Sequence, residues 1–249
     1  MKTKIMTLFV FFMCSSLGYS NEWKVKNKWQ ISCGIVDNES LVINGKPKIK
    51  YNKKEFKLES VIFKLDKGDI GKCITDTRPV DNGRFEYSGR QEITHKLPFG
   101  YTIFETDLIF NGPHSYRSTI FQIHDGRIGG APPSWIGIKT YGKIIHMFPK
   151  GKCSAENCKM IKYKYIKPGV KYRFRAEIDY PKKSKVISIK YYLDDEFILQ
   201  HLKVPIAKKK TDGPYGPNKP YIKIGIYRIG EEGTQSYEYN NLIIKNKKK

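Results

Sequence analysis

The sequence predicts an all-β sandwich of two antiparallel sheets, and three observations lead to this fold class. Short runs of alternating apolar and polar residues recur along the chain. The sequence has no long stretch with helical periodicity. Clusters of glycine and proline, such as residues 129–135 and 211–220, separate the runs as loops would. Many short strands with turns between them favour a sandwich in which one face of each sheet packs inward.

Two segments show the strand alternation most clearly, and a third shows a hairpin. Residues 170–180 place Val170, Tyr172, Phe174, Ala176 and Ile178 on the inward face. Residues 101–110 alternate in the same way from Thr102 to Phe110. Residues 186–193 and 196–202 read as two strands joined by a turn at Asp194 and Asp195. Further short strands are expected at 41–44, 60–65, 117–124, 135–139, 143–148 and 221–228.

Residues 1–20 have the layout of a secretory signal peptide. Lys2 and Lys4 precede an apolar run from Ile5 to Met13, and small or polar residues lead to a cleavage point after Ser20. The run is too short to span a bilayer, and no later segment of the sequence approaches that length. We therefore expect residues 21–249 to form one domain that is secreted or periplasmic, monomeric and not a membrane protein.

The chain carries a formal net charge of +22, which attracts polyanions. Nucleic acid, an anionic membrane and an acidic polysaccharide all fit this charge, and composition does not choose among them. The sequence has no recognisable nucleic-acid-binding module, so we do not expect a nucleic-acid partner.

Four cysteines follow the signal peptide, an even number that indicates disulfides in an exported chain. Cys153 and Cys158 enclose a short segment typical of a closed hairpin loop, which leaves Cys33 to pair with Cys73. A zinc site is disfavoured, because no CxxC pair or group of histidines accompanies these cysteines.

Polar side chains share one face on each of three predicted strands. In YIKIGIY (221–227), Ile222, Ile224 and Ile226 face the core, which leaves Tyr221, Lys223 and Tyr227 on the opposite face, with Gly225 leaving room there for a ligand. In STIFQIHDG (118–126), Gln122 and His124 share the face opposite Phe121 and Ile123. In GRQEI (89–93), Arg90 and Glu92 share a face while Ile93 turns inward. We expect these polar faces on the solvent side of the sheet.

These groups suit β-elimination on a uronic acid in a polysaccharide. The C5 proton of such a sugar becomes removable when an arginine and an amide neutralise the neighbouring carboxylate, a task that suits Arg90 and Gln122. A base then removes the proton and an acid protonates the O4 leaving group, and His124 and Tyr227 suit these steps. The chemistry requires no metal or organic cofactor.

The three motifs, in this order, resemble those of the jelly-roll polysaccharide lyases. In alginate lyases the corresponding stretches read R-x-E, Q-I/V-H and Y-x-K-x-G-x-Y, as RQE (90–92), QIH (122–124) and YIKIGIY (221–227) do here. The segments VIFKLDKGDIG (61–71) and KIGIYR (223–228) are closer in style to the heparin lyase I-like group. The resemblance covers roughly residues 55–245.

This resemblance implies a concanavalin-like β-jelly roll whose concave sheet binds an anionic polysaccharide. It implies that Arg90 and Gln122 engage the carboxylate, that His124 is a base or neutraliser, and that Tyr227 is the acid. No stretch matches a calcium loop, so we expect no metal. Further substrate-binding residues are expected in the same motifs, at Lys223, Glu92, Tyr221 and Arg228.

Two other functions fit parts of the pattern. A non-catalytic lectin-like module would explain the charge, but it has no need of His124 and Tyr227 together. A glycoside hydrolase needs two carboxylates about 5–10 Å apart, typically on one strand as E-x-D-x-E. The nearest candidates, 105–107 and 177–179, lack the third acid.

Overall fold

The structure of the protein is a computed structural model. It describes residues 24–25, 29–37, 40–44, 48–52, 57–67, 71–73, 90–114, 117–125, 132–149, 151, 153–206, 219–229 and 233–247. For strand residues before 59, for 71–73 and for 229, only the backbone is described. The predicted signal peptide, residues 1–20, lies outside these ranges.

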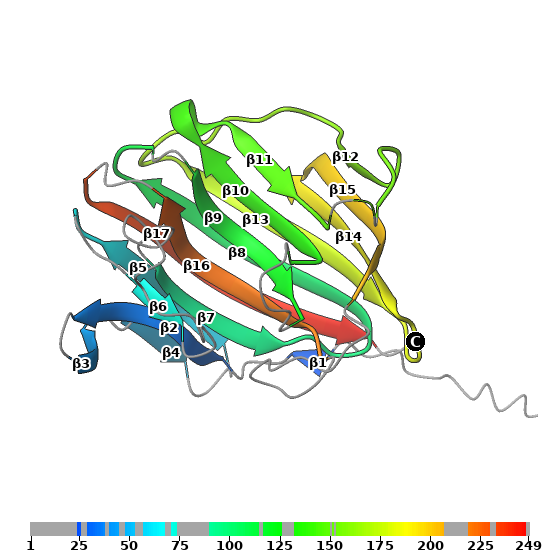
Figure 1. Cartoon of the computed structure of the whole chain (residues 1–249), viewed down its shortest axis with the longest axis horizontal. Coiled ribbons are helices and arrows are strands. Elements are labelled where there is room, and N and C mark those ends of the chain that lie inside the picture. The colour runs from blue at the N-terminus through cyan, green and yellow to red at the C-terminus, as the bar shows by residue number, and fades with distance from the viewer. Residues whose placement is uncertain are drawn as a thin grey trace, which may run out of the picture.

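The strands form two antiparallel sheets, one with nine strands and one with eight (Figure 1). The nine-stranded sheet has the order β12 (Cys158–Met160), β15 (Glu196–Pro205), β14 (Val186–Leu193), β13 (Lys171–Tyr180), β8 (Gly100–Asn111), β17 (Gln235–Lys247), β5 (Lys57–Leu65) and β4 (Lys48–Asn52), with β1 (Lys24–Val25) paired to β17. The eight-stranded sheet has the order β11 (Ile144–Met147), β10 (Ser134–Lys139), β9 (Arg117–His124), β16 (Tyr221–Ile229), β7 (Arg90–Lys96), β2 (Gln30–Asp37) and β3 (Ser40–Asn44), with β6 (Gly71–Cys73) paired to β2.

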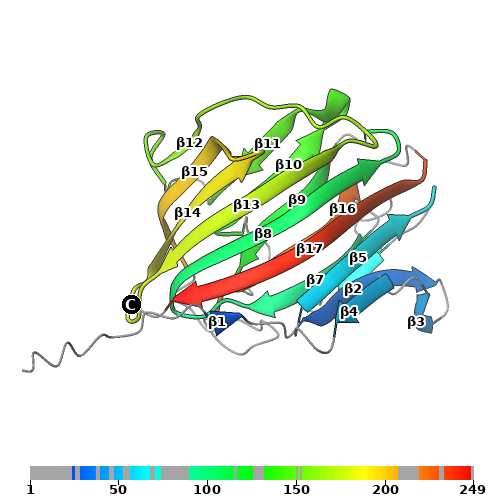
Figure 2. The ribbon, with the colours of Figure 1, turned by 180° about the vertical axis from the view of Figure 1, so that it is seen from behind.

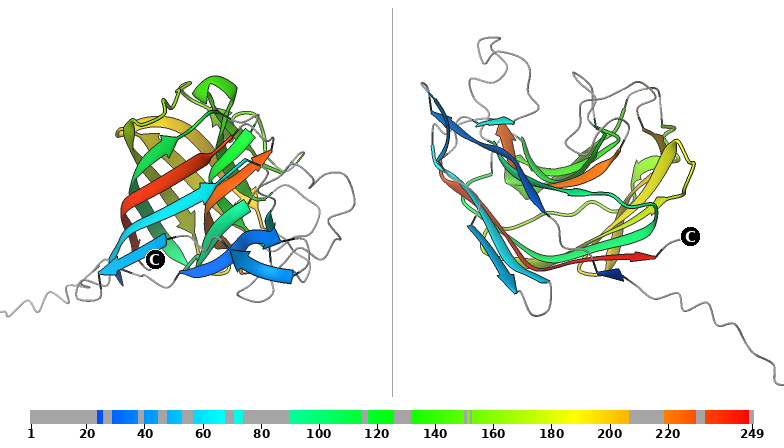
Figure 3. Two further views of the ribbon diagram at one scale, coloured as in Figure 1. Left: turned by 90° about the vertical axis from the view of Figure 1, so that its left-hand side faces the viewer. Right: turned by 90° about the horizontal axis from the view of Figure 1, so that it is seen from below.

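The two sheets are stacked as layers and curve in the same sense (Figure 3). The outer face of the eight-stranded sheet is therefore concave, and the long strands β8, β13 and β17 form the convex layer behind it (Figure 2). This arrangement confirms the predicted all-β sandwich of two antiparallel sheets. Within the described ranges, no helix is long and apolar enough to cross a bilayer.

The core between the sheets consists of the apolar residues that strand alternation assigns to it. Phe104 and Leu108 of β8 and Phe174 and Ile178 of β13 are buried, as are three isoleucines of β16: Ile222, Ile224 and Ile226. Phe104, Phe121 and Phe174 contact one another with ring centroids 5.0–6.1 Å apart, in tilted or edge-on arrangements that stabilise aromatic pairs. Val170 differs from its prediction, because β13 begins one residue later and leaves this side chain 42% exposed.

The last strand, β17, was not among the predicted strands. Its residues alternate between buried and partly exposed, but the alternation changes phase at Asn241, where φ is +53°. The register of β17 against β8 shifts at this point. A simple period of two does not continue through such a shift, which hides the strand in the sequence. The lysine-rich end is therefore part of a sheet as far as Lys247.

The predicted hairpin at Asp194 and Asp195 is confirmed. Both residues have positive φ, 51° and 61°, as a two-residue type I′ turn requires. The Asp194 carboxylate also accepts a hydrogen bond from the backbone N–H of Arg173 (2.8 Å), which ties the turn to β13.

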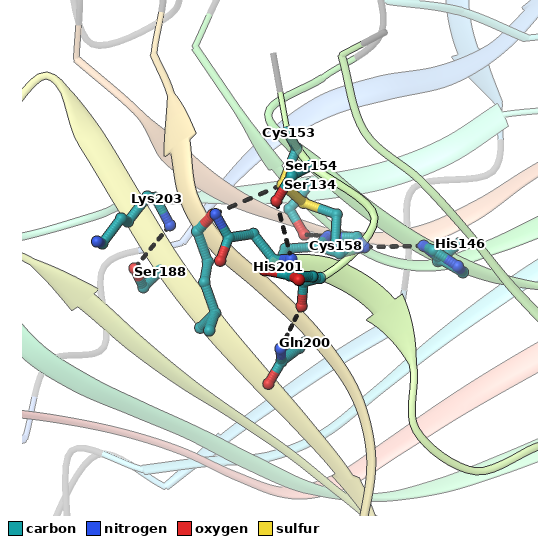
Figure 4. The surroundings of a disulfide bond; sticks show 12 residues. Ser134, His146, Cys153, Ser154, Cys158, Ser188, Gln200, His201 and Lys203 are labelled. Atoms are coloured by element: carbon teal, nitrogen blue, oxygen red, sulfur yellow. Dashed lines mark hydrogen bonds between the residues drawn. A yellow bond between two sulfur atoms is a disulfide. The ribbon is translucent and has the colours of Figure 1, made fainter. Parts of the chain in front are cut away.

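The predicted Cys153–Cys158 disulfide is present, with a Cα–Cα distance of 5.9 Å (Figure 4). The partner of Cys158 across the β12–β15 ladder is His201. The backbone register also sets Cys33 of β2 opposite Cys73 of β6. Directly opposed residues in an antiparallel pair are close enough for a disulfide, but these two side chains lie outside the described residues, so this second disulfide stays a prediction.

A chain of hydrogen bonds beside the disulfide crosses between the two sheets. The Ser134 hydroxyl contacts the Tyr191 hydroxyl and lies 2.6 Å from Nδ1 of His201. Nε2 of His201 lies 2.9 Å from Nδ1 of His146 (Figure 4). Every group is satisfied when Tyr191 donates to Ser134, Ser134 donates to His201, and His201 donates to a neutral His146. Burial, with a smaller contribution from His146, lowers the pKa of His201 to about 3. Burial also lowers the pKa of His146.

This depressed pKa of His201 predicts that folding stability falls with acidification. Between the ordinary histidine pKa of 6.5 and the folded pKa of about 3, the unfolded chain binds a proton that folded His201 does not. The loss approaches about 1.4 kcal/mol per pH unit for this one group. We expect urea unfolding from pH 7 to pH 4 to show a shallower decline in His201→Gln than in wild type. Equal slopes in the two proteins would contradict the assignment.

Candidate active site

The three predicted motifs lie side by side on the outer face of the eight-stranded sheet. Strand β16 is in the middle, paired with β7 on one side and β9 on the other. Its isoleucines enter the core, so Tyr221, Lys223 and Tyr227 face outward onto the concave side of the sheet. The register pairs Tyr227 with Arg90, Lys223 with Gln122 and Tyr221 with His124.

The middle of this row is a buried carboxylate held by two donors. Lys223 Nζ lies 2.7 Å from one oxygen of Glu92, and the Gln122 side-chain amide donates to the other oxygen at 2.7 Å. Glu92 is only 1% exposed. A buried carboxylate is tolerated when it is paired and hydrogen-bonded, as it is here. Glu92 therefore orients Gln122 and Lys223, and its predicted contact with substrate stays a prediction.

One end of the row consists of His124 and Tyr221. The Tyr221 hydroxyl lies 3.1 Å from Nδ1 of His124, and the two rings stack with centroids 5.4 Å apart. Tyr221 is buried, whereas His124 is half-buried. This contact fixes the orientation of the imidazole ring. Tyr221 therefore positions His124, and its predicted contact with substrate stays a prediction.

The other end of the row consists of Arg90 and Tyr227. The Arg90 guanidinium lies over the Tyr227 ring, 3.9 Å from its centroid, in a cation–π contact. Tyr227 is half-buried and Arg90 is buried. A guanidinium carries its N–H donors at the edge of its plane, so stacking on the Tyr227 ring fixes the plane in which those donors lie.

The burial of this row corrects the expectation of a solvated face. Arg90, Glu92, Gln122, Lys223 and Tyr221 all have less than a tenth of their surface exposed. Only His124 and Tyr227 of the predicted set are half-buried. These are the two residues to which the sequence assigns proton transfer.

The structure also corrects the prediction that Arg228 binds substrate. Arg228 follows Ile222, Ile224 and Ile226 in the alternation, so it points to the inner side of the sheet and is 1% exposed. Its guanidinium donates to the backbone carbonyls of Asp66 and Gly233. Arg228 therefore joins the chain before and after β16.

Gly225 has a different purpose from the predicted space for a ligand. Its φ is +137°, and a Cβ there would lie 2.2 Å from the Gln91 carbonyl oxygen and 2.7 Å from the Glu92 Cα. The glycine is required because the backbone of β7 approaches at this point. The absence of a side chain at Gly225 lets β7 come close to β16, and Glu92 of β7 then lies near enough to pair with Lys223.

Three residues near this face, Thr119, Trp135 and Arg117, were missed by the sequence interpretation. The register of β9 shifts between Phe121 and Ser118 against both neighbouring strands. As a result Thr119, which strict alternation from His124 places inside, accepts a hydrogen bond from Trp135 (2.8 Å). Arg117 stacks over the same Trp135, which is the register partner of Gln122. In the sequence, Trp135, Gly137 and Lys139 alternate with Ile136 and Ile138. This pattern would have predicted that Trp135 lies on the outer face of the sheet.

Within the described part of the chain, no three His, Cys, Asp or Glu side chains lie together as metal ligands would. The row consists of two cations, an amide, an imidazole and two phenols beside a buried carboxylate.

Comparison with known proteins identifies similar folds but no similar sequences. No family model and no curated protein matches the sequence. Among solved structures, the chain superimposes on alginate lyase A1-II′, a member of polysaccharide lyase family 7, with a TM-score of 0.54 at 13% identity. The match covers 90% of this chain and 96% of that chain. The fold is that of the family 7 alginate lyases.

Two further structures of alginate lyase A1-II′ agree with this result. A variant in complex with a substrate, GGMG, has a TM-score of 0.53 at 12% identity, over 90% of this chain and 94% of that chain. A second variant, in complex with a product, GGG, has a TM-score of 0.52 at 12% identity, over 88% and 94%. The predicted resemblance to jelly-roll polysaccharide lyases is thus confirmed at the level of the alginate lyase fold.

The Glu92–Lys223 pair predicts that folding stability depends strongly on both side chains. Glu92→Gln leaves a buried ammonium and Lys223→Met leaves a buried carboxylate, and each should reduce stability by about 3 kcal/mol. The double variant buries neither charge, so its loss should be smaller than the sum of the two. Urea unfolding of the four proteins tests this, and strictly additive losses would show that the two charges do not interact.

The close approach at Gly225 predicts that alanine is poorly tolerated there. Gly225→Ala combines positive φ with a collision against β7, and should cost more than about 3 kcal/mol. Gly169→Ala is the matched control, because Gly169 has a φ of +74° and no atom lies within 4 Å of the position that a Cβ would take. The control should lose only the backbone cost of about 1–2 kcal/mol. Similar unfolding midpoints for both variants would remove the collision as the reason for Gly225.

Proposed function

We propose that this protein is a polysaccharide lyase that cleaves an anionic, uronic-acid-containing polysaccharide by β-elimination. The observation that carries the proposal is the placement of Arg90, Gln122, His124, Lys223 and Tyr227 on one concave face by three adjacent strands. The fold supports it, because the chain superimposes on solved structures of an alginate lyase. The high positive charge also suits a polyanionic substrate.

In this proposal Arg90 and Gln122 neutralise the sugar carboxylate, which stabilises the negative charge that develops when C5 loses its proton. Gln122 has two amide N–H groups, one of which binds Glu92, so the second is assigned to the substrate. Arg90 touches Tyr227, so the sugar whose carboxylate Arg90 binds lies beside the Tyr227 hydroxyl. Tyr227 then donates a proton to O4 as the C4–O4 bond breaks and the C4=C5 double bond forms.

His124 is assigned to the C5 proton or to the carboxylate. Tyr221 engages Nδ1, so the proton transfer falls to Nε2 of His124. Tyr221 and Tyr227 are six residues apart, about 20 Å along a fully extended strand. The sheet that carries the row is curved (Figure 3). In this proposal His124 and Tyr227 act on one sugar from the two ends of the row.

The stereochemistry of the sugar separates the two roles. In mannuronate and glucuronate the C5 hydrogen and O4 lie on the same side, so Tyr227 alone can serve as base and acid. In guluronate and iduronate they lie on opposite sides, which requires a base across the ring and assigns that step to His124.

Two features support export as part of the proposal. Residues 1–20 have the layout of a signal peptide, and the Cys153–Cys158 disulfide suits an oxidising compartment.

The test is incubation with alginate, polyglucuronate and heparin while following the ultraviolet absorbance of the new C4=C5 double bond. We expect absorbance to appear with at least one polymer and to fall at least about 10³-fold in Tyr227→Phe, because an essential proton donor is lost. Tyr221→Phe is the matched control and should retain more activity, since it only releases His124. Reducing ends without absorbance would indicate hydrolysis, and binding without product would favour the lectin-like alternative. A fully active Tyr227→Phe would remove this tyrosine from the mechanism.

A further inference from the structure

A second surface of the protein exposes three tyrosines. Tyr141 lies in the 3-10 helix η1 (Thr140–Gly142), which joins β10 to β11. Tyr163 and Tyr165 lie in the segment between β12 and β13, which crosses the top of the view in Figure 1. Their exposed fractions are 85%, 65% and 54%. Large aromatic side chains exposed together are uncommon on a soluble surface and mark sites of interaction.

The two segments that carry these tyrosines are joined by backbone hydrogen bonds. Lys143 and Tyr165 form an antiparallel bridge. The N–H of Ile144 donates to the Lys164 carbonyl (3.0 Å), and the N–H of Ile166 donates to the Gly142 carbonyl (2.8 Å). Opposed residues in such a bridge point to the same side, so Lys143 lies beside Tyr165. The Lys143 ammonium also lies over the Tyr163 ring, 4.7 Å from its centroid.

The backbone under these tyrosines is fixed. A Cβ at Gly142, whose φ is +78°, would lie 2.1 Å from the Ile166 carbonyl oxygen, so the two segments are in close contact. The same carbonyl lies 3.0 Å from Nε2 of His114, whose ring stacks on Phe110. Tyr141 itself has a φ of +64°, an uncommon conformation for a residue other than glycine, asparagine or aspartate. The fold therefore holds a costly conformation at the most exposed tyrosine.

The two segments that carry the three rings are rich in lysine. Residues 139–147 contain Lys139 and Lys143, and residues 159–171 contain five further lysines, with no aspartate or glutamate in either segment. Glu196, which belongs to β15, forms ion pairs with both Lys162 and Lys164. The surface thus combines rigid aromatic faces with an excess of positive charge.

We propose that this Tyr141–Tyr163–Tyr165 surface, with Lys143 at its centre, is a second binding site for the acidic polysaccharide. Each sugar ring presents C–H groups that pack on an aromatic face, and its carboxylate reaches outward to an ammonium group. The surface lies at the Tyr227 end of the catalytic sheet, because Lys139 pairs with Arg117, and Arg117 pairs with Ile229 of β16. A long chain bound at Tyr227 can therefore continue across β9 and β10 to η1.

The identity of this polymer rests on the proposed function, but the site itself is tested by binding and not by turnover. The background is Tyr227→Phe, which prevents cleavage of the ligand. Into it we introduce Tyr141→Ser, Tyr163→Ser and Tyr165→Ser together. These side chains are exposed, so the melting temperature should stay unchanged. Affinity is measured for a long polymer and for a short oligosaccharide that fills only the catalytic face.

The expected result is a loss of about tenfold or more in affinity for the polymer, equal to about 1.4 kcal/mol. Affinity for the oligosaccharide should change less than about twofold, as should oligosaccharide turnover when the three substitutions are placed in wild type. Lys143→Gln should weaken polymer binding, whereas Lys182→Gln, an exposed lysine on the β13–β14 turn, should not.

Unchanged polymer binding in the triple variant would overturn the proposal. An equal loss for polymer and oligosaccharide would also overturn it, since the tyrosines would then act on the catalytic face. Single-stranded oligonucleotides are a necessary comparison, because bases also stack on aromatic rings beside lysines. Tighter binding of an oligonucleotide, lost in the same variant, would assign the surface to nucleic acid. If no polymer is cleaved but the tyrosine-dependent binding persists, the proposed function fails and this site stands.

Discussion

The candidate site depends on β16 being paired on both sides within the curved sheet. Pairing fixes the alternation of its side chains, so the isoleucines that build the core also determine which residues face outward. A shift of one residue would turn Lys223 and Tyr227 into the apolar core and move Ile222, Ile224 and Ile226 to the outer face. The same strand register therefore determines both the packing of the core and the geometry of the site. Gly225 adds to it by letting β7 approach closely enough for Glu92 to reach Lys223.

The charges of the site follow from this constraint. Because Glu92 neutralises Lys223 and holds Gln122, the centre of the row is neutral and rigid before any substrate arrives. The other cation of the row, Arg90, contacts the Tyr227 ring. The sheet thus separates residues that position other side chains from residues that would meet a sugar. Preorganised donors of this kind need no rearrangement when negative charge develops on the substrate.

Much of the core and of the candidate site was predictable from the alternation of apolar and polar residues alone. Phe104, Leu108, Phe174 and Ile178 lie in the core as expected, and the three motifs share a face as expected. The predictions fail where the orientation of a side chain depends on how its strand pairs with a neighbouring strand. The register shift of β9 that turns Thr119 outward, and the shift that breaks the pattern of β17, are properties of strand pairs. The burial of the polar row and the partners of Glu92 likewise depend on residues distant in sequence.

The hydrogen-bond chain at the far edge of the sandwich has a mechanical consequence. Tyr191 and His201 belong to the nine-stranded sheet, and Ser134 and His146 belong to the eight-stranded sheet, so all three links of the chain cross between the layers. The interdigitated core already resists sliding of one sheet over the other. Hydrogen bonds add a directional requirement, because they break when their partners move about an ångström apart or lose alignment. This edge therefore constrains the lateral offset of the two layers at named atoms, in addition to the packing of the core.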